Sequence, residues 1–242
     1  MEPLYDRDLA YIHAVGFSNS AERAAPEILR RLKAAGINVR RVVDVGCGAG
    51  PLSKALVEAG FEVTGVDASQ ELINLARAAA PSATFVNASA YEAVLGPCEA
   101  ILAVGEPLTY HSESADADHL VGKFFRRAAE TLPSGGLLIF DVIERGEPSL
   151  AGRFWASGDD WAVLVETRED QPRRVLTREI ETFRRVGDSY RRGREVHCVR
   201  LFDAHALCDQ LADCGFAIET ATAYGAYPLL PRRRAFFAVR KS

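Results

Sequence analysis

The sequence predicts an α/β protein built on a doubly wound, mostly parallel sheet. Between residues 37 and 143, short apolar strand patterns alternate with helical patterns, and this alternation favours parallel strands joined by right-handed crossovers. Residues 203–242 then contain one helical pattern and two strand patterns with no helix between them, which predicts a closing antiparallel hairpin. We therefore expect a sheet of seven strands, five of them parallel.

The composition is ordinary for a soluble globular protein. The chain has 242 residues, 48% apolar and 26% charged, which is enough for one α/β domain with an insertion. A net charge of −4 without a basic tail gives no reason to expect nucleic-acid binding, and no run approaches the ~20 apolar residues of a membrane span. The five cysteines lack metal-ligand spacing, and charged residues stand where a signal peptide would be apolar. We therefore expect a cytoplasmic protein with no metal, nucleic-acid or membrane partner.

The first parallel strand leads into a glycine-rich turn. The β-branched run from Val42 to Val45 ends at Gly46, Gly48 and Gly50, and a helical pattern begins at Pro51. Glycines let a ligand approach the main chain closely, and the N-terminus of the helix that follows offers unpaired N–H groups. Such a turn lies at the carboxyl edge of a doubly wound sheet, where ligands bind.

The spacing of these glycines decides between nucleotide-bearing ligands. A dinucleotide site has the pattern G-x-G-x-x-G, but Pro51 stands where the third glycine would be. The second strand, 61–66, leads to Asp67. Its carboxylate could bind the ribose hydroxyls of a dinucleotide or of another nucleoside-bearing ligand, so it does not distinguish between them. The segment from Asp44 to Gly50, Asp-Val-Gly-Cys-Gly-Ala-Gly, closely resembles motif I of the class I S-adenosylmethionine-dependent methyltransferases. This resemblance implies a Rossmann-like sheet and S-adenosyl-L-methionine as cofactor, released as S-adenosyl-L-homocysteine.

The resemblance also implies a cofactor site. In this family the glycine turn passes beside the methionine part of the cofactor, and the acid that matches Asp67 binds both ribose hydroxyls. After the third strand, 84–86, the family usually places an acid against the adenine, and this chain has Ser89 there, which can accept the same hydrogen bond without charge assistance. The expected cofactor residues are Asp44, Gly46, Cys47, Gly48, Pro51, Asp67, Ala68, Ser89, Ala90 and Gly105.

The loop after the fourth strand, 100–104, is the expected place of chemistry. Gly105 to His111 resembles motif IV, which lies beside the departing methyl group in this family. Glu106, Tyr110 and His111 all fall within this loop. A helix over 116–132 and the fifth strand, 137–142, complete the parallel part.

Residues 1–36 precede the sheet and predict two helices. The first helix is expected within 5–17 and ends at Gly16. The second helix ends at Gly36. In many small-molecule methyltransferases such a leader folds over the cofactor and the acceptor pocket, so we expect aromatic side chains of this leader to line the pocket and His13 to be a candidate general base. The alternative, that these aromatic side chains only dock the leader on the core, stays open.

Residues 144–202 predict an insertion after the fifth strand. We expect a long loop over 144–160 and then three extended stretches, 161–167, 175–184 and 190–202, which form a small antiparallel layer over the pocket. Polar side chains of this layer could bind the acceptor, or they could form cross-strand ion pairs on a solvated face. The expected acceptor-binding residues are Tyr5, Tyr11, Phe17, Tyr110, Arg178 and His197.

The favoured function is methyl transfer to a small molecule by in-line displacement. The chemistry asks mainly for proximity and orientation, with a base for an acceptor that starts protonated. The candidate bases are His13, Glu106 and His111. Two alternatives are a nicotinamide-dependent oxidoreductase, which Pro51 opposes, and a protein that binds S-adenosylmethionine without transferring its methyl group. We expect a monomer or a homodimer.

Overall fold

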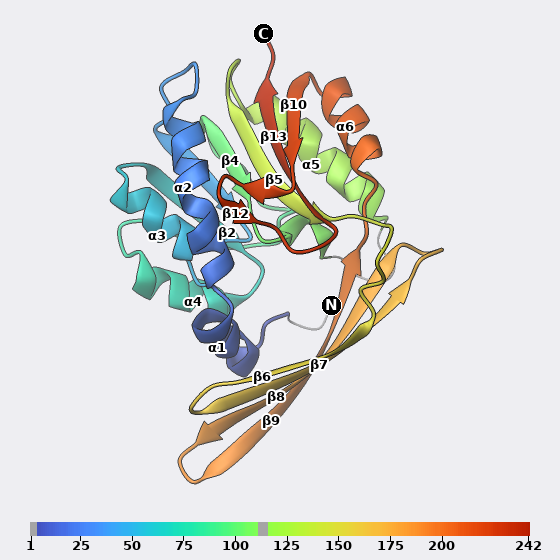
Figure 1. The fold of residues 1–242 in the computed structure, drawn as a ribbon. Helices are drawn as coiled ribbons and strands as arrows, with labels where there is room; N and C mark the ends of the chain where they lie inside the picture. The colour runs from blue at the N-terminus through green and yellow to red at the C-terminus, as the bar shows by residue number, and fades with distance from the viewer. Residues whose placement is uncertain (1–3, 111–115) are drawn as a thin grey trace.

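The computed structural model describes residues 4–110 and 116–242, and its main body is a seven-stranded sheet (Figure 1). Five strands are parallel, and the two at one side run antiparallel to their neighbours. The predicted fold class is confirmed. In spatial order the strands are β10 (Phe216–Ala221), β13 (Arg233–Arg240), β5 (Leu137–Ile143), β4 (Ala100–Ala103), β1 (Arg41–Val45), β2 (Glu62–Asp67) and β3 (Thr84–Asn87).

Helices cover both faces of this sheet (Figure 1). One face carries α2 (Asn19–Lys33), α3 (Pro51–Glu58) and α4 (Gln70–Ala79), and the other carries α5 (Ala117–Thr131) and α6 (Ala204–Asp213). Side chains begin these helices where the sequence predicts it: the Ser69 hydroxyl accepts from the Leu72 amide at 3.2 Å, and Asp203 accepts from two amides of α6. The predicted first helix, α1 (Arg7–Gly16), also ends at Gly16.

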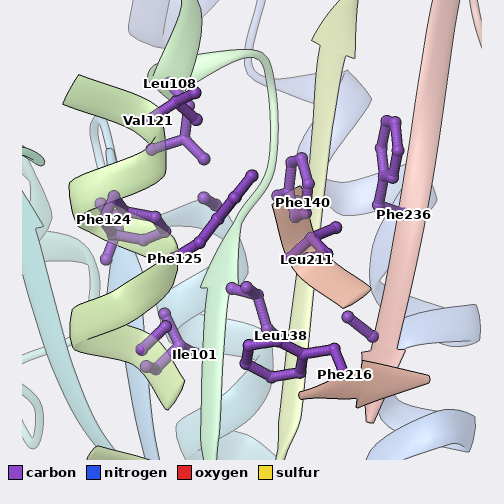
Figure 2. Packing of buried hydrophobic residues seen from close by; sticks show 14 of the residues in the cluster. Ile101, Leu108, Val121, Phe124, Phe125, Leu138, Phe140, Leu211, Phe216 and Phe236 are labelled. Carbon is purple, nitrogen blue, oxygen red and sulfur yellow. The ribbon is translucent and has the colours of Figure 1, made fainter. Parts of the chain in front are cut away.

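The larger part of the core lies between the sheet and the helices α5 and α6. Phe124 and Phe125 of α5 point toward the sheet, where they meet side chains of β4 and β5 (Figure 2). Phe140 on β5 stacks face to face on Phe236 of β13, with ring centroids 4.7 Å apart. These two residues are paired in the antiparallel register of β5 and β13, so the aromatic stack fixes where the closing hairpin joins the parallel strands.

A second, four-stranded antiparallel sheet follows β5. Its strands are β6 (Gly152–Ser157), β7 (Trp161–Asp170), β8 (Val175–Val186) and β9 (Ser189–Arg200). Its inner face packs on α1, where Val163 and Ile180 of the sheet meet Leu9 and Ile12 of the helix. This four-stranded sheet, which we call the small sheet, therefore lies beneath α1. It is at the same end of the main sheet as α1 (Figure 1).

The prediction of a long loop over 144–160 is wrong in part, because β6 lies within it. Glycine, proline, serine and aspartate residues flank 152–157, and their frequency predicts a loop for the whole segment. The six-residue strand β6 forms because it pairs with β7. The connection between β10 and β13 contains a short hairpin of β11 (Ala223–Tyr224) and β12 (Tyr227–Pro228).

Within residues 4–110 and 116–242, no helix is long and apolar enough to cross a membrane. The same part of the chain contains no cluster of three or more histidine, cysteine, aspartate or glutamate side chains placed to hold a metal ion.

The Phe140–Phe236 stack generates a stability prediction. Phe140→Ala removes one ring from a fully buried pair, and we expect it to lower the free energy of unfolding by about 3–5 kcal/mol, the usual cost of such a truncation. Urea unfolding followed by circular dichroism measures this. The control is Val239→Ala on β13, where the side chain is 40% exposed and the loss should stay below ~0.5 kcal/mol. Equal losses in the two variants would contradict the assignment.

Candidate active site

A cavity of about 510 Å³ opens at the carboxyl ends of β1, β2 and β4, a volume within the usual range of ligand sites. The main sheet and the leader both contribute to its walls. Every residue predicted to hold the cofactor lines it: Asp44, Gly46, Cys47, Gly48, Pro51, Asp67, Ala68, Ser89, Ala90 and Gly105. The structure thus brings together in one place residues that the sequence spreads over four strand ends.

The glycine turn needs its glycines for two different reasons. Gly46, Gly48 and Gly50 all have positive φ angles, between 55° and 84°, which side chains disfavour. A Cβ on Gly46 would also collide with the ring of Pro107, so no larger residue fits there. A Cβ on Gly48 would meet nothing within 4 Å, and Gly48 lines the cavity. The space beside Gly48 is therefore available to a ligand, which fits the cofactor that motif I implies.

The Asp67 carboxylate is held by main-chain amides that follow two neighbouring strands, β1 and β2. Its Oδ2 accepts from the Gly48 amide and its Oδ1 from the Ser69 amide, both at 2.9 Å. The side-chain amide of Asn87, at the end of β3, donates to the main-chain oxygens of Asp67 and Ala68. Burial raises the pKa of Asp67. Both carboxylate oxygens are therefore held in place by main-chain amides.

Two more groups of the turn are buried. Asp44 is 2% exposed, and its carboxylate accepts from the Ser53 hydroxyl at 2.6 Å. Burial raises the pKa of Asp44 to about 7, a shift that a cationic ligand group in the cavity would oppose. Burial also raises the pKa of the Cys47 thiol, which therefore stays protonated.

The loop after β4 is held by a buried acid that the sequence did not single out as functional. Gly105 and Glu106 have φ angles of 88° and 68°, and their amides donate to the Asp141 carboxylate at 3.0 and 2.7 Å. The Tyr224 hydroxyl donates to the same carboxylate at 2.8 Å. Burial raises the pKa of Asp141 to about 6. A lone acid within the otherwise apolar run 137–143 was the available signal for this role.

Glu106 and Arg178 do not line the cavity. The Glu106 carboxylate turns to Arg178, at 3.4 Å, and to Arg233. This carboxylate is thus paired with two guanidinium groups outside the cavity lining. His197 is 1% exposed and lies behind Tyr5, with ring centroids 5.0 Å apart, and its Nε2 is 2.8 Å from a Glu195 oxygen.

Four side chains form what we call the aromatic wall of the cavity: Tyr5, His13, Phe17 and Tyr110. The hydroxyl groups of Tyr5 and Tyr110 are 3.0 Å apart, and the ring of Tyr5 meets that of His13 edge-on at 5.0 Å. Burial and, secondarily, the nearby His197 lower the pKa of His13 to about 4, so its imidazole is neutral at pH 7. The Nδ1 of His13 is buried and has no hydrogen-bond partner among the described residues.

Tyr11 lies outside the cavity. Its hydroxyl donates to Asp160 at 3.1 Å, and its ring packs under the Arg184 guanidinium. Residues two apart on a helix point about 200° apart, so Tyr11 and His13 cannot face the same cavity, whereas His13 and Phe17, four apart, do. The helical period alone therefore predicts that Tyr11 and His13 point in different directions.

His111 falls outside the described residues.

Other residues of the cavity lining were not predicted as site residues, and among them Glu92 and Lys123 carry charge. Ser20 and Ala21 follow Phe17 by three and four residues, a helical spacing that could have pointed to them. The residues that sequence reasoning missed are Leu4, Ser18, Ser20, Ala21, Ala49, Leu52, Ser69, Leu72, Tyr91, Glu92, Val104, Pro107, Leu120 and Lys123.

Comparison with known proteins shows the family to which the chain belongs. A family model described as "Methyltransferase domain" matches residues 17–221, most of the chain. The chain belongs to this family. It is a methyltransferase, and the match favours methyl transfer over the nicotinamide-dependent oxidoreductase that Pro51 opposed.

The methyltransferase has relatives over nearly its whole length. YqeM of Bacillus subtilis (strain 168), classed by its name with the methyltransferases, is 27% identical over 212 residues, 84% of each chain. An S-adenosylmethionine-dependent methyltransferase from Clostridium acetobutylicum is similar in structure, with a TM-score of 0.81 at 17% identity over 96% of each chain. CalS10 from Micromonospora echinaspora, an amino pentose methyltransferase solved with S-adenosylmethionine bound, has a TM-score of 0.73 at 20% identity over 100% of each chain.

Gly48 generates the first prediction for this site. Gly48→Val places a side chain in the space beside the turn, and we expect it to abolish S-adenosylhomocysteine binding in calorimetry while the circular dichroism spectrum stays native. The matched control is Gly60→Val, which has a similarly positive φ of 93° and open space around a Cβ, but lies outside the cavity lining. Unchanged affinity in the Gly48 variant, or equal loss in both, would contradict the cofactor site.

Asp44 generates a pH prediction. Its folded pKa of about 7 lies above its ordinary value of 3.8, so the folded protein binds more protons between these values and loses stability as the pH rises through that window. Asp44→Asn removes this loss, and without cofactor we expect the variant to be more stable than the wild type at pH 8 by on the order of 2–4 kcal/mol, and by less at pH 5. Thermal unfolding at both pH values measures this. A stability difference that does not depend on pH would exclude the explanation.

Proposed function

We propose that this methyltransferase acts on a small, uncharged polar molecule and transfers the methyl group to a nitrogen or oxygen atom held against the aromatic wall. The observation that carries the proposal is the chemistry of that wall. His13 is neutral because its pKa is lowered, and the raised pKa of Tyr5 keeps its hydroxyl protonated. The charged lining residues come from β1, β2, the connection between β3 and β4, and α5 instead: Asp44, Asp67, Glu92 and Lys123. A neutral, aromatic-lined pocket favours an acceptor without a charged group of its own.

In this proposal the cofactor is held by the chain's strand ends. Asp67 binds the ribose hydroxyls, the turn at Gly46 and Gly48 accommodates the methionine part, and Ser89 and Ala90 lie beside the adenine. Bound there, S-adenosylmethionine supplies a methyl group that is already activated by its sulfonium. The remaining task of the protein is to bring the acceptor lone pair into line and to exclude water.

His13 is the proposed orienting group. A neutral imidazole accepts a hydrogen bond from an acceptor N–H or O–H through its unprotonated ring nitrogen and thereby turns the acceptor's lone pair toward the methyl group. With a pKa of about 4, His13 does not retain a proton at pH 7, so its main contribution is alignment, and the proton passes on to solvent. The Tyr5 hydroxyl, still protonated, can donate to the acceptor from the same wall.

The division of the chain fits this assignment of roles. We propose that residues 1–36 form the lid, that 37–143 and 203–242 hold the cofactor, and that 144–202 cover the acceptor. CalS10 is named an amino pentose methyltransferase, which supports an amine on a sugar-like ring, reacting in its uncharged form, as the first acceptor to test. The five cysteines form no disulfide, which supports a cytoplasmic enzyme, acting as a monomer or homodimer.

An acceptor panel tests the substrate class. Production of S-adenosylhomocysteine is measured with amino sugars, with phenols and, as the anionic contrast, with trans-aconitate. We expect turnover with at least one neutral amine or hydroxyl compound and none with the tricarboxylate. Turnover restricted to the carboxylate would contradict the proposal. No turnover with any compound would support the alternative of a protein that binds the cofactor without transferring its methyl group.

His13 generates a separate prediction. His13→Ala should lower kcat/KM for the acceptor by about 10- to 100-fold, about 1.4–2.7 kcal/mol of transition-state stabilisation, while S-adenosylhomocysteine affinity changes by less than about threefold. Because the pKa of His13 is about 4, it should cause no inflection in the rate between pH 6 and 8. Tyr11→Phe, on the same helix but outside the cavity, is the matched control. A variant with full activity would remove His13 from the mechanism.

A further inference from the structure

We propose that Glu195 is a positioning residue that holds Tyr5 in the aromatic wall and so sets the geometry in which the acceptor meets the methyl group. This inference deepens the proposed function and rests on it. Glu195 lies on β9 of the small sheet and does not line the cavity itself, so it acts only through the residues that it holds.

The Glu195 carboxylate binds the main chain of the leader with both oxygens. The Tyr5 amide donates to Oε2 at 2.7 Å and the Asp6 amide to Oε1 at 2.9 Å. On the other side, the Ser69 hydroxyl donates to the Tyr5 carbonyl oxygen at 2.8 Å. Tyr5 is therefore fixed at both of its peptide groups, between the small sheet and the residue that begins α4.

This fixation holds a conformation that Tyr5 does not prefer. Its φ is 56°, in the left-handed region, which costs a bulky residue on the order of 1–3 kcal/mol. Hydrogen bonds from amides to a carboxylate are charge-assisted and about twice as strong as neutral ones, so they can offset that cost. Without the carboxylate, two amides would lose their partner and the strained residue would be free to relax.

The conformation places the Tyr5 ring in the site. The ring stands 5.0 Å from those of both His13 and His197, and its hydroxyl meets that of Tyr110. Glu195 also binds His197 through Nε2 at 2.8 Å. Because a carboxylate only accepts, Nε2 carries the hydrogen, and the ring behind Tyr5 is held in one orientation. One side chain thus fixes both Tyr5 and the ring that supports it.

An ordinary cross-strand ion pair is the alternative explanation, and Glu181 shows what such a pair looks like. Glu181 faces the other side of the small sheet and pairs with Arg192 of the neighbouring strand, and its side chain is 35% exposed. The Glu195 side chain is 13% exposed, and two of its three partners are main-chain amides of the leader, 189 and 190 residues away along the chain. These contacts belong to the leader and the site rather than to the sheet.

Hydrogen exchange tests the contact directly. In Glu195→Gln the side chain keeps its length, but its NH₂ group faces an amide donor and can accept nothing from it. Because the remaining carbonyl oxygen can still accept from one amide, we expect at least one of the Tyr5 and Asp6 amides to exchange at least about tenfold faster by NMR, and Glu181→Gln, the matched control, to leave both unchanged. Unchanged protection in the Glu195 variant would overturn the proposal. The readout needs no acceptor and no turnover, so it stands even if the acceptor panel fails.

A double-mutant cycle separates positioning from general stability. With an acceptor from the panel, Glu195→Gln and Tyr5→Phe should each lower kcat/KM by about tenfold or more, while the affinity for S-adenosylhomocysteine changes by less than about threefold. If Glu195 acts through the Tyr5 hydroxyl, the double variant should be little worse than Tyr5→Phe alone. Additive losses, or a loss confined to cofactor affinity, would show that Glu195 only stabilises the fold.

Discussion

The hydrogen bond from the Gly48 amide to the Asp67 carboxylate is the interaction around which the site is built. It ties the turn after β1 to the end of β2, while the Gly46 and Cys47 amides donate to the Val66 carbonyl oxygen on the same neighbour. Parallel strands bring these ends to one edge of the sheet, but only the bonds between them give the edge a fixed shape. The leader and the small sheet then close over this edge.

Buried carboxylates recur at this edge, and each has a structural cost. Asp44, Asp67 and Asp141 end or nearly end three parallel strands, and burial raises the pKa of all three. A carboxylate in such a place is retained only where donors satisfy it or where a ligand needs it. Asp141 is satisfied by two amides and the Tyr224 hydroxyl, whereas Asp44 and Asp67 also face the cavity. Stability is thus given up at residues that line the cavity.

Sequence reasoning reached the sheet, the glycine turn and the cofactor cavity because these depend on local periodicity and on glycines whose conformation has few substitutes. It could not decide where Glu106 points, because the pairing with Arg178 and Arg233 joins segments more than 70 residues apart. It assigned Tyr11 to the acceptor pocket together with His13, although residues two apart on a helix point in nearly opposite directions. The strand β6 was hidden since its partner, not its own composition, determines it. Distant contacts, rather than weak propensities, account for most of what was missed.

The buried thiol in the glycine turn has a chemical consequence. Cys47 lines the cavity that we propose for the sulfonium cofactor, and a thiolate in that position would compete with the acceptor for the methyl group. Because Cys47 is 5% exposed and its pKa is raised by burial, the sulfur stays in its weakly nucleophilic, protonated form. The enzyme can therefore keep a small sulfur side chain beside a reactive electrophile without inactivating itself.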